Sequence, residues 1–164
     1  MAAFNFSIDL PIRNDWANVD LIRSSVQNCF TAMFSDLDGC HALAMITGEL
    51  LENAIKYGRW NERDRDPVFR LRVWGDGESA RVSVENPIRT DDKEVGRLFE
   101  TLEWIRGYQS TDEAYRARLL QIAESPRDGS TSRLGLVRIA YEGNCRLDAD
   151  LNRDTLKVTA TVGF

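Results

Sequence analysis

The chain has 164 residues, of which 43% are hydrophobic, an ordinary share for a globular protein that excludes a disordered chain. Its 21 basic and 26 acidic residues give a formal net charge of −5, which argues against a protein that binds nucleic-acid phosphates through a basic surface. The sequence has three cysteines without CxxC spacing, a start without signal-peptide features and no apolar run of membrane-spanning length. We therefore expect a single cytoplasmic domain, residues 1–164, with neither nucleic acid nor membrane as a partner.

Hydrophobic periodicity predicts strands and helices along most of the chain. A strand is expected at Phe4–Leu10, where apolar residues alternate, and Pro11 is expected to end it. The remaining predicted elements, in chain order, are helices from about Asp15 to Phe34 and Asp38 to Tyr57, strands Val68–Trp74 and Ala80–Glu85 joined as a hairpin, a helical segment from Thr90 to about Glu124, a short helix near Arg133–Tyr141, and strands at about Cys145–Leu151 and Thr155–Val162.

The most informative segment is the end of the second predicted helix, which reads ELLENAIKYG from Glu49 to Gly58. At 100° per residue, Glu49, Asn53 and Lys56 fall on one face of the helix, and the apolar side chains fall elsewhere. An asparagine in mid-helix suggests a task for its amide oxygen, and Mg²⁺ prefers such hard oxygen ligands. The alternative is an exposed helix face on which Lys56 forms an ion pair with Glu52.

The pattern ExxxNAxKYG resembles the N box of the GHKL ATP-binding superfamily, which includes gyrase, Hsp90 and histidine kinases. In that superfamily the asparagine coordinates magnesium and the glutamate is the general base. The resemblance therefore implies ATP and Mg²⁺ as cofactors, Asn53 as the metal ligand and Glu49 as the catalytic base. It also implies a nucleotide contact for Lys56, and Gly58 fits as the residue that ends the helix.

The segment Arg81–Ile88, RVSVENPI, lies where the superfamily's G1 box has a strand that ends in DxGxG. Strand alternation places Val82, Val84 and Asn86 on one face, so Asn86 takes the place of the family's adenine-binding aspartate. An amide oxygen still accepts a hydrogen bond from the adenine amino group, at a loss of about 1 kcal/mol or fivefold in affinity. Ile88 replaces the first glycine of the motif. The alternative is a strand that ends in an Asn-Pro turn with no role in nucleotide binding.

The segment Gly129–Ile139, GSTSRLGLVRI, resembles the G2 box that closes over the phosphates in this superfamily. Gly135 and Leu136 match the motif, whereas Arg133 stands where an earlier glycine is usual. The resemblance implies that these three residues lie at the nucleotide, where backbone amides at the start of a helix bind anions. Arg133 either contacts phosphate or blocks the pocket. A capped helix without any ligand is the alternative.

The order of elements resembles that of small GHKL domains, most of all the anti-sigma-factor serine kinases of the RsbW and SpoIIAB type. The Asn86-Pro87 pair, the long helical segment and RLGLVRIA also resemble the SiaB-like kinases, which act on a SiaC-type partner. The resemblance implies an α/β (α+β) two-layer sandwich, in which a mostly antiparallel mixed sheet packs on helices. It also implies a helical ATP lid at about residues 90–132.

The function implied by this resemblance is that of an ATP-binding serine/threonine protein kinase that regulates a small bacterial signalling protein of the STAS or SiaC-like kind. Two alternatives stay open, because the N box is intact while the G1 and G2 boxes are altered. One is a catalytically inactive module of the same fold that binds a partner, and the other is an ATP hydrolase. A monomer and a homodimer are both compatible with the sequence.

Overall fold

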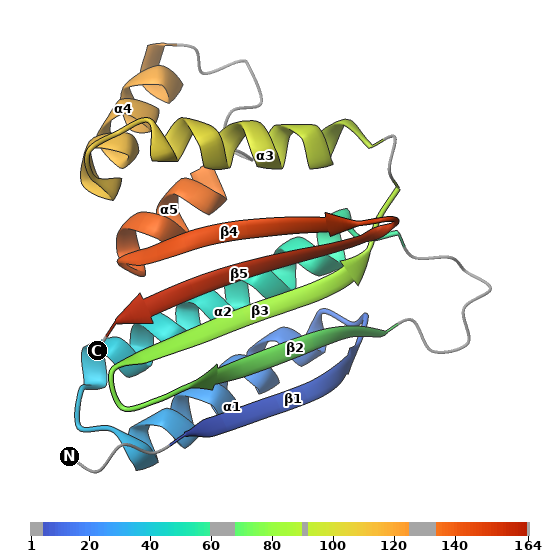
Figure 1. The fold of residues 1–164 in the computed structure, drawn as a ribbon, viewed down its shortest axis with the longest axis vertical. Helices are drawn as coiled ribbons and strands as arrows, with labels where there is room; N and C mark the ends of the chain where they lie inside the picture. Colours follow the sequence, from blue (N-terminus) through green and yellow to red (C-terminus); the bar gives the residue numbers. More distant parts are fainter. Residues whose placement is uncertain (1–4, 60–67, 90–91, 125–133, 164) are drawn as a thin grey trace.

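The computed structural model describes residues 5–59, 68–89, 92–124 and 134–163. Within these residues five strands form one sheet in the order β1-β2-β3-β5-β4, and every pairing is antiparallel (Figure 1). The strands are β1 (Phe6–Arg13), β2 (Val68–Gly75), β3 (Ser79–Pro87), β4 (Cys145–Asn152) and β5 (Thr155–Gly163). The helices are α1 (Ala17–Met33), α2 (Leu37–Tyr57), α3 (Lys93–Arg106), α4 (Thr111–Glu124) and α5 (Leu134–Glu142).

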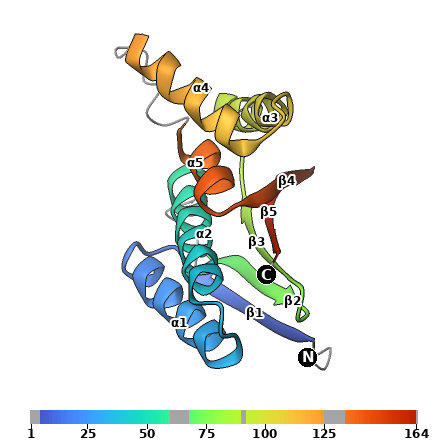
Figure 2. The same ribbon diagram turned by 90° about the vertical axis from the view of Figure 1, so that its left-hand side faces the viewer.

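The helices α1 and α2 cover one face of the sheet, which Figure 2 shows from the side. The core lies between these two layers, because apolar side chains recur at helical spacing on α1 and α2 and at every second position on the strands. Phe30 of α1, Leu43 and Leu51 of α2, Leu71 of β2 and Val82 of β3 have no exposed surface. The predicted α/β two-layer sandwich is confirmed.

The first strand differs from its prediction, because it continues through Pro11 to Arg13. Pro11 lies opposite Arg70 of β2, and β1 is an edge strand of the sheet. An edge strand needs only half of its backbone donors for pairing, so a proline is tolerated where the missing N–H would face solvent. The prediction that Pro11 ends this strand is therefore wrong.

The predicted helical segment after β3 contains two helices, α3 and α4. Its start at residues 90–91 and the end of the predicted lid, residues 125–132, lie outside the described residues. Asp92 caps the start of α3, where its side chain accepts a hydrogen bond from the Glu94 backbone N–H. At the other end, Arg106 donates to the Leu147 backbone carbonyl (3.3 Å) and to the Asp148 carboxylate (2.7 Å) of β4. These bonds attach α3 to the edge of the sheet.

The helix α2 begins and ends close to its predicted limits. Asp36 caps its N-terminus by accepting from the Gly39 N–H at 3.1 Å. Gly58 follows its last residue, as predicted, although its φ of −67° is not the left-handed conformation for which glycine is usually needed. Across the described part of the chain, every helix is too short or too polar to cross a membrane.

Candidate functional site

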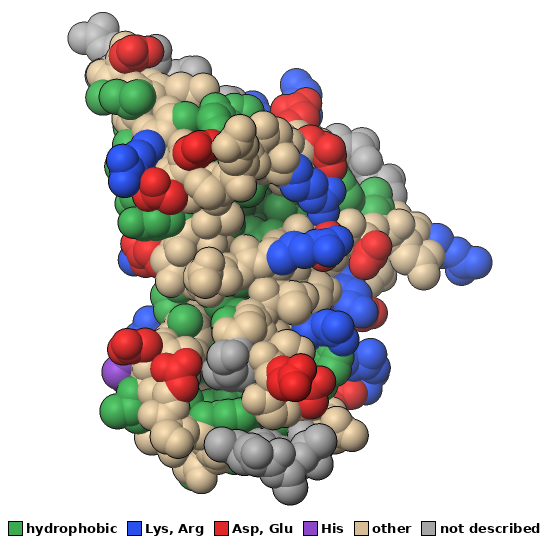
Figure 3. Space-filling view, turned by 60° about the vertical axis from the view of Figure 1, so that its left-hand side comes forward, with side chains coloured by type: hydrophobic (Ala, Val, Ile, Leu, Met, Phe, Trp, Pro, Cys, Tyr) green, Lys and Arg blue, Asp and Glu red, His purple; other side chains and the backbone are tan. Residues whose placement is uncertain are grey.

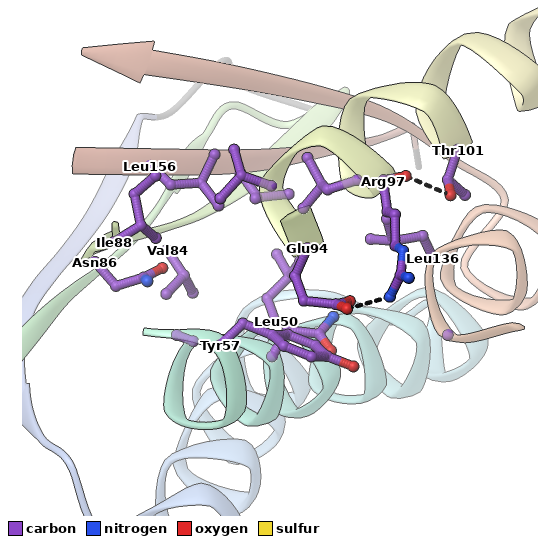
Figure 4. A pocket seen from close by; sticks show the side chains of 16 residues that line it. Leu50, Tyr57, Val84, Asn86, Ile88, Glu94, Arg97, Thr101, Leu136 and Leu156 are labelled. Carbon is purple, nitrogen blue, oxygen red and sulfur yellow. Dashed lines mark hydrogen bonds and ion pairs between the residues drawn. The ribbon is translucent and has the colours of Figure 1, made fainter. Parts of the chain in front are cut away.

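A cavity of about 80 Å³ lies between α2, the sheet and α3 (Figure 4). Its walls are mostly apolar and come from α2 (Leu50, Ala54), from the sheet and the residue that follows β3 (Val84, Ile88, Leu156, Val158), from α3 (Val95, Leu98) and from α5 (Leu136). Figure 3 shows the surface indented between the upper part of the molecule, formed by α3 and α4, and the sheet below, with hydrophobic side chains in the indentation. An apolar cavity with few polar groups is typical of a ligand site.

Asn53 and Asn86 are the two amide side chains in this cavity. Asn86 is 5% exposed, and its Nδ2 donates to the Pro87 backbone carbonyl at 3.2 Å. This bond leaves the Asn86 Oδ1 as the free acceptor of the amide. Val82 and Val84 are buried together with Asn86, which agrees with the face predicted from strand alternation.

Gly135 and Leu136 line the same cavity from the first turn of α5. Arg133, for which the sequence suggested a phosphate contact, lies outside the described residues. The cavity thus brings together residues from three segments that are far apart in the chain, on α2, β3 and α5. These segments are the ones that resemble the N, G1 and G2 boxes.

Glu49 is not among the described residues that line the cavity. It lies on α2, one helical turn before Asn53. Its side chain is 26% exposed, and its Oε1 lies 3.8 Å from Nη1 of Arg138 on α5. Burial raises the pKa of the Glu49 carboxyl above its usual range, Glu52 adds to the rise, and Arg138 opposes it. Lys56 also lies off the cavity lining and is exposed, with its Nζ 5.1 Å from the Tyr57 ring centroid.

Sequence reasoning missed four polar residues of the cavity, Tyr57, Glu94, Arg97 and Thr101. Glu94 and Arg97 form an ion pair on α3, and the Glu94 side chain points toward α2 (Figure 4). Thr101 donates to the Arg97 carbonyl at 2.8 Å. The apolar spacing of α3 predicted a buried face, but the spacing alone could not tell against which part of the molecule that face would pack.

The side chains that line the cavity have the chemistry to bind a nucleotide with a divalent cation, but the cavity is small for such a ligand. Asn53 and Glu94 offer hard oxygens of the kind that Mg²⁺ prefers, and Asn86 offers an acceptor among apolar walls that suits a planar base. The described residues contain no cluster of three or more His, Cys, Asp or Glu that could hold a metal, so waters and phosphates would complete the coordination. The cavity of about 80 Å³ is smaller than the roughly 300 Å³ of a small ligand pocket, so ATP would need a wider opening than this structure shows.

Comparison with known proteins finds similarity among solved structures. No family model matches the chain, and no curated protein matches it. Among solved structures, the chain is similar to a chain of the SiaB-SiaC complex from Pseudomonas aeruginosa, with a TM-score of 0.67 and 14% sequence identity over 96% of this chain and 89% of that chain. At this identity the likeness concerns the fold alone. The two chains thus share an architecture over nearly their full lengths.

Proposed function

We propose that this protein binds ATP with Mg²⁺ and phosphorylates a Ser or Thr residue of a small regulatory protein. The observation that supports the proposal is the meeting of Asn53, Asn86 and the Gly135-Leu136 pair at one cavity. These segments are far apart in the sequence, so it is the fold that brings them together at one cavity. It is also what a nucleotide site built from an N box, a G1 box and a G2 box requires.

The adenine end of the nucleotide would occupy the apolar part of the cavity. Asn86 would accept a hydrogen bond from the adenine amino group through Oδ1, because its Nδ2 already donates to Pro87. Val84 and Leu156 would contact the faces of the base. The phosphates would then extend toward Gly135 at the start of α5, where backbone N–H groups favour anions.

The cation would lie at Asn53, whose amide oxygen is the protein ligand that the proposal requires. When bound, Mg²⁺ neutralises phosphate charge and holds the phosphates for in-line transfer. Glu94 on α3 is the second hard oxygen donor in the cavity. Its ion pair with Arg97 would be exchanged for contacts with the ligand when α3 moves outward.

Glu49 would accept the proton of the acceptor hydroxyl. Its position beside the cavity, one helical turn before Asn53, lets a partner protein approach from the α2–α5 surface while the nucleotide stays enclosed. Burial raises the pKa of Glu49 toward neutral pH, which makes the carboxylate a better proton acceptor than an exposed glutamate. The role of the protein is thus positioning and charge neutralisation, as in other phosphoryl transfers.

The partner would be a small regulatory protein of the STAS or SiaC-like kind. The similar solved structure is a complex of SiaB with SiaC, which supports a partner of this size and role for a chain of the same fold.

A second candidate is a partner-binding module without catalysis, and one observation favours it. Ile88, which replaces a glycine of the G1 box, is fully buried and lines the cavity. Together with the small volume of about 80 Å³, it restricts the space for a nucleotide. In such a module the protein would bind its partner in the absence of ATP.

The test is capture of the partner from the native host, followed by intact-mass measurement of the captured protein after incubation with ATP and Mg²⁺. The kinase predicts a mass gain of one phosphate on the partner, and the Glu49→Gln variant should capture the partner without this gain. Capture without any mass gain in the unsubstituted protein would refute the kinase and favour the module. A gain that persists in Glu49→Gln would refute the role of Glu49.

A further inference from the structure

The candidate base Glu49 is surrounded by charged side chains from three helices. Arg138 and Glu142 reach it from α5, Glu52 is its neighbour on α2, and Arg23 approaches from α1. The two carboxylates oppose the ionised form of Glu49, as does burial, whereas the two guanidinium groups favour it. The two cations therefore counter the effects that favour the protonated form of Glu49.

Arg138 is the cation with a direct contact to Glu49, at 3.8 Å. Its orientation is fixed from the other side, because its Nε donates to the Glu142 carboxylate at 2.9 Å, one turn further along α5. The ion pair with Glu142 therefore directs the rest of the guanidinium toward α2. The nearest approach of the two side chains joins Nη1 of Arg138 to Oε1 of Glu49.

The position of α5 against α2 makes this contact possible. At the end of α5, a Cβ on Gly143 would lie 2.6 Å from the Ile139 carbonyl oxygen and 2.8 Å from Cδ1 of Ile46, so this position next to α2 favours glycine. At its start, α5 lines the nucleotide cavity through Gly135 and Leu136. One short helix therefore contacts both the candidate phosphate region and the candidate base.

Arg23 contributes from the opposite side of Glu49 without a direct ion pair to it. Its side chain crosses Gly48, where an added Cβ would lie 3.0 Å from the Arg23 Cδ. Its guanidinium pairs with Asp20 at 2.6 Å on its own helix. Arg23 therefore adds a longer-range attraction, and Arg138 remains the group that contacts the carboxylate.

We propose that Arg138 is a positioning residue, which holds the Glu49 carboxylate ionised and oriented for proton transfer through a Glu49–Arg138–Glu142 chain of ion pairs. The proposal rests on the proposed function in that Glu49 is the base. It goes beyond that function by assigning a task to a residue that does not line the cavity. Removal of Arg138 should leave nucleotide binding intact and change how the base responds to pH.

The experiment is a ¹³C NMR titration of the side-chain carboxyl groups in the full chain, with the Glu49 signal identified by its absence in Glu49→Gln. In Arg138→Gln the Glu49 titration midpoint should move to higher pH, since the group loses its contacting cation. Arg138→Lys should restore part of the difference. Salt at 1 M should reduce the difference, because the pair is partly exposed.

The matched control is Arg146→Gln, which removes an exposed arginine paired with Asp148 at 3.2 Å on β4. It should leave the Glu49 midpoint unchanged. A second readout is the pH dependence of phosphate transfer, in which Arg138→Gln should lose more rate at low pH than at high pH, because Glu49 is then protonated over a wider range.

Different results would overturn the role of Arg138 and the proposed kinase function. An unchanged Glu49 midpoint in Arg138→Gln, or an equal change in the Arg146→Gln control, overturns the role of Arg138. Loss of magnesium-ATP binding by more than about twofold in a folded Arg138→Gln variant also overturns it, because Arg138 does not line the cavity. Failure of the unsubstituted protein to bind ATP overturns the proposed function, and the NMR midpoints still decide whether Arg138 controls Glu49.

Discussion

The helices α2 and α4 are held in the molecule in different ways. We call β1–β5, α1, α2 and α5 the body, and α3 with α4 the cap. In α2 ten residues are buried, nearly all apolar, whereas in α4 only Ala114 and Arg118 are buried. The body is therefore stabilised by a continuous apolar core, and the cap has much less of it.

The contacts between cap and body combine apolar and polar groups, because Val95 and Leu102 of α3 belong to the same buried apolar cluster as the core of the body. Arg106 of α3 bonds to β4, and Tyr115 of α4 stacks on Tyr141 of α5 with ring centroids 4.5 Å apart. Within the cap, the Arg118 guanidinium lies 4.2 Å from the centroid of the Trp104 ring. Because α4 buries little apolar surface, we expect the cap to open at a lower free-energy cost than the body, and the candidate site lies at the boundary between the two.

We predict that phosphate transfer and magnesium-ATP binding depend on residues of the body. Glu49→Gln should lower phosphate transfer about 10²- to 10⁴-fold, because it removes the basic oxygen and preserves shape. Magnesium-ATP affinity should change little, since Glu49 does not line the cavity. Asn53→Ala should instead weaken magnesium-ATP binding. Calorimetric titration and a transfer assay on both variants separate these effects, and an equal loss of binding in the two would contradict the separate roles.

The same comparison predicts unequal stability effects for leucine truncations. Leu51→Ala in the body removes a side chain with no exposed surface and should lower the free energy of unfolding by about 3 kcal/mol or more. Leu120→Ala in the cap, where this side chain is 65% exposed, should change it by less than about 0.5 kcal/mol. Urea denaturation of the two variants provides the measurement. Similar losses would mean that the cap is as tightly integrated as the body.

Nucleotide should order the cap more than the body. Amide hydrogen exchange in α3 should slow when magnesium-ATP is added, because Val95, Leu98 and Thr101 of this helix line the cavity. The amides of α1 form the internal control, since none of its residues lines the cavity. Unchanged exchange in α3 at saturating nucleotide would exclude a lid function for the cap.

The smallest predicted effect concerns recognition of the base. Asn86→Ala should weaken ATP binding about fivefold, which corresponds to roughly 1 kcal/mol for one neutral hydrogen bond. Binding of ITP should be weakened less, because ITP has a keto oxygen in place of the amino group and offers the Asn86 Oδ1 no N–H to accept from. Competition between the two nucleotides measures the difference, and equal losses for both would refute this contact.

The sequence predicted the body better than the boundary with the cap. Apolar periodicity located α1, α2 and the sheet strands to within a few residues, because these elements each bury one face. It failed at Pro11, since the tolerance for proline depends on β1 being at the edge of the sheet. Edge position is a property of strand order, which local patterns do not encode.

For the candidate site, local motifs predicted Asn53, Asn86, Gly135 and Leu136, which do line one cavity. They could not predict that Glu94 and Arg97 of α3 line it too, or that Glu49 faces Arg138 beside it. Both facts depend on how α3 and α5 pack against α2. Such contacts join residues far apart in the chain, and no motif spans them.

The cavity between α2, β3 and α5 is the proposed site of magnesium-ATP. Calorimetric titration of the protein with ATP, in the presence and absence of Mg²⁺, tests this directly. We predict saturable binding that strengthens with Mg²⁺, and in Asn53→Ala we predict that this strengthening is lost. Absence of ATP binding with Mg²⁺, or ATP binding of equal strength with and without Mg²⁺, would refute a magnesium-ATP site at this cavity.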